Sequence, residues 1–325
     1  MENTILQITP QAIEKQESPH AAFITANTTA CSIDEIRSLH HIPSFVKSNE
    51  ALISQIDFID ITADLVANIF KSERINAPEI RLSHPIKGRI PDAKHKKANE
   101  LEEWEKTIYY ERSMFVIEIP SVYEDINGNR LSLTVGGVKA YNQDNLYAND
   151  GADQHFKVFI GFQNKVCTNL CLSTDGYYAD LKVKNLQQLT ASIDMLFKSY
   201  GAAEHLHQLE RMNNYSLTEQ QFALLVGRCR MYQHLPKGVK DQLYAHELLL
   251  TDTQIGAVVK DYYHDLNFGV DSLDSISLWR LYNLFTGVNK SSYIDSFLDR
   301  SVNAFQFVKQ LQNGLDRKQH NWFLN

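Results

Sequence analysis

The chain has 325 residues, of which 43% are hydrophobic and 22% charged, and its formal net charge at pH 7 is −7. These values are typical of a globular protein with one or two domains, and the negative charge argues against a protein that coats nucleic acid over its whole surface. No apolar run approaches the roughly 20 residues of a membrane helix, no signal peptide is predicted, and four cysteines form no disulfide framework, so we expect a cytoplasmic protein without membrane contact.

The N-terminal residues up to about 50 are polar, rich in Thr, Ser, Gln and Asn, and only weakly periodic. We expect residues 1–50 to form a mobile or loosely docked segment that is dispensable for folding. The stretch DFIDITADLVANIFKSE, which begins at Asp57, then predicts an amphipathic helix. EIRLS, which begins at Glu79, predicts a short strand.

Charge is distributed unevenly along the chain. RLSHPIKGRIPDAKHKK, from Arg81 to Lys97, contains six Lys or Arg and one Asp, which gives a local net charge of +5. Its prolines and glycine predict a loop. ELEEWEK, from Glu100 to Lys106, predicts an acidic helical face that offsets this loop, with a pair of catalytic carboxylates as the alternative.

A β section follows, and its first part predicts a hairpin. SMFVIEI is apolar on both faces and should end at Pro120, whereas LSLTV alternates between apolar and polar residues. Asn127 and Gly128 between them tolerate positive φ and therefore predict a tight turn. Gly136 and Gly137 interrupt the alternation, so we expect a bulge there.

The third β element is HFKVFIGFQNKVCTNLCL, from His155 to Leu172, which alternates with one apolar face. It is longer than a typical strand, so we expect a bend near Gly161 or Asn164.

Cys167 and Cys171 lie on this element, four residues apart. On a straight strand they would share a face but stand about 13 Å apart, too far for one zinc ion or a disulfide. Only a sharp bend at Thr168 and Asn169 would bring them together. We therefore predict packed or partly covered thiols.

Helices dominate the C-terminal half. The stretch from Asn185, NLQQLTASIDMLFKSY, predicts a helix with Asn185 as its N-cap. The next helix should begin with a capping box of Ser216 and Glu219. Cys229 falls on the apolar stripe of that helix and should lie in the core. LWRLYNLF and YIDSFLDRSVNAFQFVKQL predict two more helices, and Gly287 predicts a C-cap between them.

This order of elements predicts the α+β class, with an antiparallel sheet built of a hairpin and further strands, followed by a helical C-terminal half. We divide the chain into the N-terminal segment 1–50, a sheet region 51–184 and a helical region 185–325 packed on the sheet.

Motifs of known chemistry are absent: the sequence contains no phosphate loop, dinucleotide fingerprint, HExxH or GxSxG. NDGADQH places Asp150, Asp153 and His155 before a strand, where they could hold a divalent cation, but an Asx-rich turn is the favoured interpretation. We predict no metal and no cofactor, the sequence assigns no catalytic residue, and the balance of these observations is against an enzyme.

The basic stretch is the best candidate for a functional site. Lys and Arg neutralise phosphates, and aromatic side chains beside a basic groove can stack on unpaired bases. The predicted nucleic-acid-binding residues are Arg81, Lys87, Arg89, Lys94, Lys96, Lys97, Tyr109 and Tyr110. The competing interpretation is a solvated charged surface beside tyrosines that belong to the core.

Several stretches resemble an uncharacterised Bacteroidetes mobile-element family, domain of unknown function 3871, from about Ala77 to the C-terminus. They are APEIRLSHPIKGRIPDA, TIYYERSMFVIEIPS, LSLTVGGVKAYN, HFKVFIGFQNKVCTNLC, LWRLYNLFTGVNKSSYIDSFLDR and HNWFLN. More distantly, NKVCTNL and LWRLYNLFTG are similar to a phage- and plasmid-borne family of unknown function. Neither resemblance implies an activity or catalytic residues. The order of strands and helix is also loosely similar to the core of phage single-strand annealing proteins, at the level of fold alone.

Three functional hypotheses follow. The first is a non-enzymatic, mobile-element-associated protein that binds nucleic acid, with single-stranded DNA as the expected partner. The second is a protein-interaction or anti-defence factor that docks a host or element protein. The third is a metal-dependent nuclease that uses Asp150, Asp153 and His155.

Overall fold

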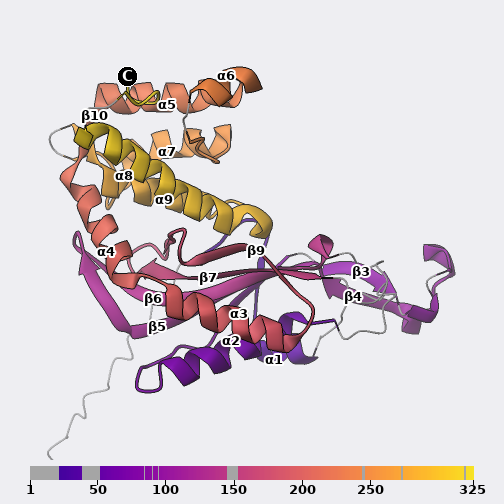
Figure 1. Ribbon diagram of the computed structural model, residues 1–325. Coiled ribbons are helices and arrows are strands. Elements are labelled where there is room, and N and C mark those ends of the chain that lie inside the picture. Colours follow the sequence, from indigo (N-terminus) through magenta and orange to yellow (C-terminus); the bar gives the residue numbers. More distant parts are fainter. Residues whose placement is uncertain are drawn as a thin grey trace, which may run out of the picture.

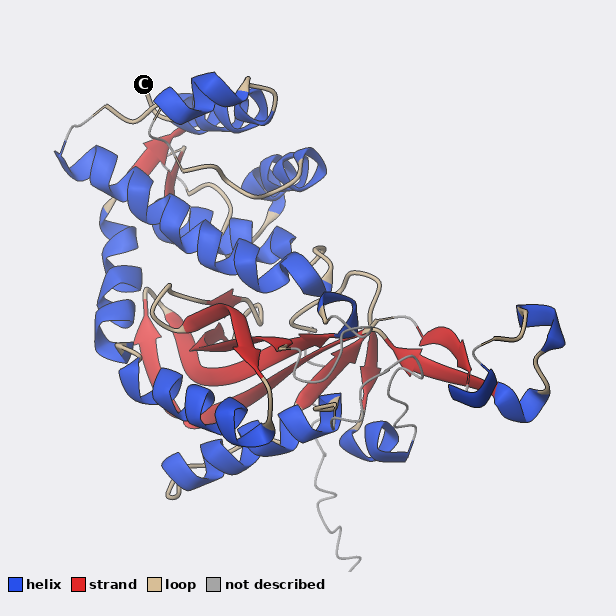
Figure 2. Ribbon diagram, turned by 45° about the vertical axis from the view of Figure 1, so that its right-hand side comes forward, coloured by secondary structure: helices blue, strands red, loops and turns tan. Residues whose placement is uncertain are grey.

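The computed structural model describes residues 22–38, 52–83, 85–89, 91–93, 95–144, 153–243, 246–271, 274–317 and 320–325. A curled antiparallel sheet lies at the centre, helices cover both of its faces, and a thin two-stranded extension leaves the body at one end (Figures 1 and 2). The C-terminal half is largely helical. The predicted α+β class is confirmed.

Within the described residues the sheet has seven strands: six follow the order β1-β2-β5-β6-β7-β8, and the seventh, β9, also pairs with β7. All of these pairings are antiparallel. The strands are β1 (Thr29–Cys31), β2 (Glu79–Leu82), β5 (Arg112–Ile126), β6 (Asn129–Ala140), β7 (Gln154–Asn164), β8 (Leu170–Cys171) and β9 (Tyr177–Val183). The short strand predicted from Glu79 is therefore confirmed as β2.

The hairpin predicted between β5 and β6 is confirmed, since Asn127 and Gly128 have φ values of 51° and 79°. The predicted end of the strand at Pro120 is wrong, because β5 continues to Ile126. Its register shifts between Ile119 and Tyr123, and this irregularity accommodates a proline that cannot donate to the ladder.

The bulge predicted at Gly136 and Gly137 is wrong, because both residues stay in register with β5. Close packing explains these glycines instead. A Cβ on Gly137 would lie 2.4 Å from Cζ of Phe58, and a Cβ on Gly136 would lie 2.1 Å from the carbonyl oxygen of Phe115. Because neither glycine has a side chain, β6 can lie close to the ring of Phe58 and to the backbone of β5.

The bend predicted near Asn164 is confirmed, but the strand does not continue straight to Leu172. β7 ends at Asn164, the chain reverses, and Cys171 pairs with Phe162 across the new strand β8. Thr168 in this turn has a positive φ of 57°.

Cys167 and Cys171 are both free thiols within this reversal. Burial raises the pKa of Cys167 to about 11 and that of Cys171 further still, so both are protonated at neutral pH. Among the described residues, no group of three or more His, Cys, Asp or Glu is arranged to hold a metal ion.

Each face of the sheet packs on a different set of elements. Helices α2 (Gln55–Ile69) and α3 (Leu186–Ser199) cover one face, and Phe58 of α2 meets the rings of Phe115 and Phe156 edge to face. The start of α9 (Ile294–Arg317) lies on the other face (Figure 1). The helix predicted from Asp57 is confirmed as α2, capped by Ser54.

The N-terminal segment predicted over residues 1–50 is described at 22–38, which includes the short helix α1 (Ile33–Ser38). These residues are docked on the body. Phe23 and Ile24 are fully buried in the same apolar cluster as the start of α9, and β1 pairs with β2. The rest of this prediction lies outside the described residues.

The C-terminal half adds five more helices among the described residues and a small two-stranded sheet. They are α4 (Ala202–Arg211), α5 (Glu219–Gln233), α6 (Lys237–Gln242), α7 (Asp252–His264) and α8 (Leu278–Asn289), with β10 (Ser216–Thr218) paired to β11 (Ser275–Ser277). The 3-10 turns η4 (Tyr141–Gln143) and η5 (Met212–Asn214) complete the body. No helix of the described part is both long and apolar enough to cross a membrane.

The caps of these helices differ from the prediction at two places. Asn185 caps α3 and Cys229 is buried, as predicted. The N-cap of α5, however, is Thr218, because Ser216 is engaged in the β10–β11 ladder. The chain also passes Gly287 in helical conformation.

Candidate nucleic-acid interface

The basic stretch does not fold as the predicted loop: part of it forms a strand of the extension, defined here as residues 85–110. β3 (Pro85–Arg89) pairs with β4 (Lys106–Tyr110) in antiparallel register, and the two strands project from the body (Figures 1 and 2). Between them lie the 3-10 turns η1 (Pro91–Ala93), η2 (Ala98–Glu100) and η3 (Glu103–Glu105). The acidic stretch therefore forms short turns rather than a regular helical face.

Charge pairing within the extension follows from this fold. Lys96 Nζ lies 2.6 Å from Glu105 Oε1, and Lys106 Nζ lies 2.6 Å from Glu103 Oε1. Glu100 accepts a hydrogen bond from the backbone N–H of Lys97. Residues 85–110 include six Lys or Arg and five Asp or Glu, so the extension is nearly neutral as a whole.

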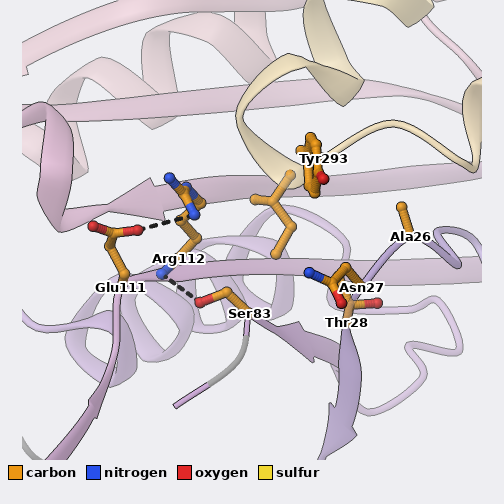
Figure 3. Close-up of a pocket in the computed structure, with 8 residues that line it drawn as sticks. Ala26, Asn27, Thr28, Ser83, Glu111, Arg112 and Tyr293 are labelled. Carbon is orange, nitrogen blue, oxygen red and sulfur yellow. Dashed lines mark hydrogen bonds and ion pairs between the residues drawn. The ribbon is translucent and has the colours of Figure 1, made fainter. Parts of the chain in front are cut away.

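The base of the extension is braced by Arg112 (Figure 3). Its backbone N–H donates to Ser83 Oγ, and its guanidinium lies 2.9 Å from Glu111 and 2.5 Å from Asp295 of α9. A cavity of about 160 Å³ beside it is also lined by Tyr293. Because two carboxylates hold Arg112, it joins the extension to α9 rather than offering a charge to a ligand.

Two of the predicted residues make their contacts with the body. Arg81 lies on β2, where its guanidinium donates to the hydroxyl and the carbonyl of Thr28. Tyr110 ends β4, packs against the main core and accepts a hydrogen bond from Gln55 at its carbonyl. These contacts with the body give Arg81 and Tyr110 a structural role that needs no nucleic acid.

The other predicted residues fall within the extension. Lys87 and Arg89 are on β3 and Tyr109 is on β4, opposite Ile86. Lys96 is ion-paired, and Lys97 is exposed. Lys94 lies outside the described residues. The fold thus pairs part of the basic stretch with residues 106–110, which follow the acidic stretch.

Trp104 is the residue that the sequence analysis did not select. It lies in η3 of the extension and 70% of its surface is exposed. Its position on a projecting element leaves the ring accessible to a partner, and the amphipathic tryptophan side chain is suited to such a contact. The signal in the sequence was a lone tryptophan among glutamates, in EEWEK.

The residues of the nuclease hypothesis are only partly described, since Asp150 lies outside the described range. His155 Nδ1 lies 2.6 Å from Asp180, and this hydrogen bond lowers the pKa of the Asp180 carboxyl. The backbone N–H of His155 donates to Asp144. His155 is therefore bound to two other carboxylates, and none of its hydrogen bonds or ion pairs with described residues involves Asp153.

Searches among curated proteins and among solved structures found no match to this chain. One family model does match, and it covers residues 2–324, nearly the whole length. The chain therefore belongs to the family described as "Domain of unknown function, B. Theta Gene description (DUF3871)".

Proposed function

We propose that this protein is a non-enzymatic binding protein for single-stranded DNA and that the extension carries the interface. The observation that supports this most directly is Trp104, which is exposed on the same projecting element as Lys97. Aromatic platforms next to basic side chains bind unpaired bases without sequence preference. The association with mobile elements is part of the same proposal and rests on the family resemblance.

The charge balance of the extension sets how this interface would work. Glu103 and Glu105 already pair with two of its lysines, so phosphates must compete with these carboxylates. Stacking on Trp104 would then contribute a larger share of affinity than phosphate contacts. We expect binding to be moderate and its salt dependence to be shallow.

The test is fluorescence anisotropy with unrelated single-stranded oligonucleotides over a range of salt concentrations. Trp104→Ala should weaken binding between fivefold and about 100-fold, because stacking of one base is worth roughly 1–3 kcal/mol. Tyr263→Ala, which removes an exposed aromatic side chain of α7, is the matched control and should leave affinity unchanged. Replacing Lys94, Lys96 and Lys97 together by Ala should flatten the slope of log K against log salt, but by less than the value of about 2 for three free lysines, because Glu105 already pairs with Lys96.

A protein partner is the second candidate, and the near neutrality of the extension favours it. Exposed tryptophans are frequent anchors of protein interfaces. If the unaltered chain binds no oligonucleotide at moderate salt, the first proposal fails. A partner that is captured equally with and without nuclease treatment, and lost with Trp104→Ala, would then identify a protein-interaction or anti-defence factor.

A further inference from the structure

A polar cleft of about 600 Å³ lies at the end of the sheet remote from the extension. Its floor is formed by β5, β6 and β7, one rim by residues 74–79 and the other by the turn after β7. Glu118, which lines it, stands six residues along β5 from Arg112 at the base of the extension, or about 20 Å. The cleft is therefore a separate surface from the proposed interface.

The floor arises from a change of residue type along one face of the sheet. Near α9 this face presents Met114, Val138 and Phe159, which are buried in an apolar cluster. Further along the same strands, at positions of the same parity, it presents Glu118, Ser132 and Gln163. If this face of the sheet served packing alone, it would be apolar along its whole length. The polar side chains at one end therefore indicate a further role.

Two polar side chains of the floor are buried without a full set of partners. Ser132 is 1% exposed and Gln163 is 5% exposed. Within the described part of the chain, the Ser132 hydroxyl makes no hydrogen bond, and the Gln163 amide makes one long contact, 3.4 Å from its nitrogen to the carbonyl of Thr168. Both side chains line the cleft and keep hydrogen-bonding capacity that no described residue uses, so they can bind a polar ligand there.

The rim supplies three cationic side chains and one carboxylate, that of Glu79, so its charge is net positive. Lys165 is held by Glu118 at 2.7 Å, and Arg130 pairs loosely with Asp125 at 3.4 Å. Arg74 is exposed, and its guanidinium makes no hydrogen bond or ion pair with any described residue. A guanidinium is suited to two-point recognition of a phosphate.

We propose that this cleft binds a small organic phosphate of nucleotide size, with the phosphate on Arg74 and the polar body of the ligand on Ser132 and Gln163. Its volume falls in the range of small-molecule sites. The amide and hydroxyl of the floor can pair with the donors and acceptors of a base edge. The phosphate is either that of a free nucleotide or that at the 5′ end of a strand. This inference does not depend on the proposed role of the extension.

Isothermal titration calorimetry on the full chain tests the proposal with three probes: 5′-nucleoside monophosphates, inorganic phosphate, and a short oligonucleotide with and without a 5′-phosphate. Arg74→Gln should weaken binding at least tenfold, because it removes a hydrogen bond to a charged group. Lys71→Gln makes the same change of charge three residues away, outside the cleft, and should leave affinity unchanged. Ser132→Ala and Gln163→Leu should each weaken binding several-fold, and thermal melting establishes that they fold.

Each outcome decides the proposal. Mononucleotide binding that Arg74→Gln weakens supports a free nucleotide. A gain in strand affinity on adding the 5′-phosphate, lost in Arg74→Gln and without mononucleotide binding, supports a strand end. Equal losses in Arg74→Gln and Lys71→Gln, or no saturable binding of any probe, would overturn it. Trp104→Ala should leave mononucleotide binding intact, which separates this site from the extension.

Discussion

The sheet and the extension each hold a lysine and a carboxylate at the same separation, in opposite surroundings. Lys139 Nζ lies 2.6 Å from Asp144 within the sheet region, and these side chains are 0% and 3% exposed. Lys106 Nζ lies 2.6 Å from Glu103 in the extension, and these are 46% and 91% exposed. Water screens the exposed pair but not the buried one. The two ion pairs therefore contribute different energies although their N–O distances are equal.

This contrast extends to the two regions as a whole. In the sheet, β6 has a strand on each side and residues buried on both faces. Among its described residues the extension has two strands, and a pair of strands alone is marginally stable in water. The body therefore carries the stability, while the extension can change its surface with little cost to the fold.

The largest loss of stability should come from deleting the N-terminal residues that pack, together with the start of α9, on one face of the sheet. Deleting residues 1–24 removes the buried side chains of Phe23 and Ile24, which should lower the free energy of unfolding by roughly 5–10 kcal/mol. That loss is comparable with the whole stability of a typical domain. Urea unfolding followed by circular dichroism measures it.

Deleting residues 1–20 is the matched control for this truncation. It leaves Phe23 and Ile24 in place, together with the carbonyl of Ala22 that accepts from Thr168. We expect an unchanged urea midpoint. If both truncations leave the urea midpoint unchanged, Phe23 and Ile24 do not contribute to the stability of the fold.

The second prediction concerns the buried pair. Lys139→Met leaves Asp144 buried without its cation, which should cost about 3–5 kcal/mol at pH 7. Lys106→Met removes the exposed cation of the comparison and should produce no measurable change. Similar losses of unfolding free energy in the two variants would show that burial does not make the two ion pairs energetically different.

The same pair predicts a dependence on pH. Burial lowers the pKa of Lys139 to about 8, against 10.5 for an ordinary lysine. Between these values the unfolded chain binds a proton at Lys139 that the folded chain does not, so this residue increases stability as the pH rises. The difference between the original chain and Lys139→Met should therefore grow from pH 8 to pH 10.5.

The sequence predicted local structure well where a short-range signal specifies it. Asn127-Gly128 and the N-cap Asn185 belong to this kind, because neighbouring residues alone decide a tight turn or a cap. Predictions failed where distant contacts decide. Ser216 pairs with Ser277, and Gly137 makes room for Phe58, and neither relation is visible in local periodicity.

The candidate site shows the same limit. The basic stretch was found by its charge, but its pairing with residues 106–110 was not, because β3 and β4 are joined across 16 residues of loop and turns. Arg81 and Tyr110 were selected for their residue types, although Thr28 and Gln55 hold them in the body. Trp104 was overlooked because exposure is a property of the fold.

The smallest effect on stability should come from removing most of the extension. Replacing residues 87–108 by a short Gly-Ser linker keeps Tyr110 in the core and the brace of Arg112 to Asp295. Because the core lies in the sheet and the helices, we expect the free energy of unfolding to change by less than about 1 kcal/mol, while binding of oligonucleotides without a 5′-phosphate is lost. A shortened chain that binds oligonucleotide as tightly as the original would move the proposed interface off the extension. A large fall in the urea midpoint, with binding lost, would instead show that the extension is part of the folding unit and that stability and binding are not divided between the two regions.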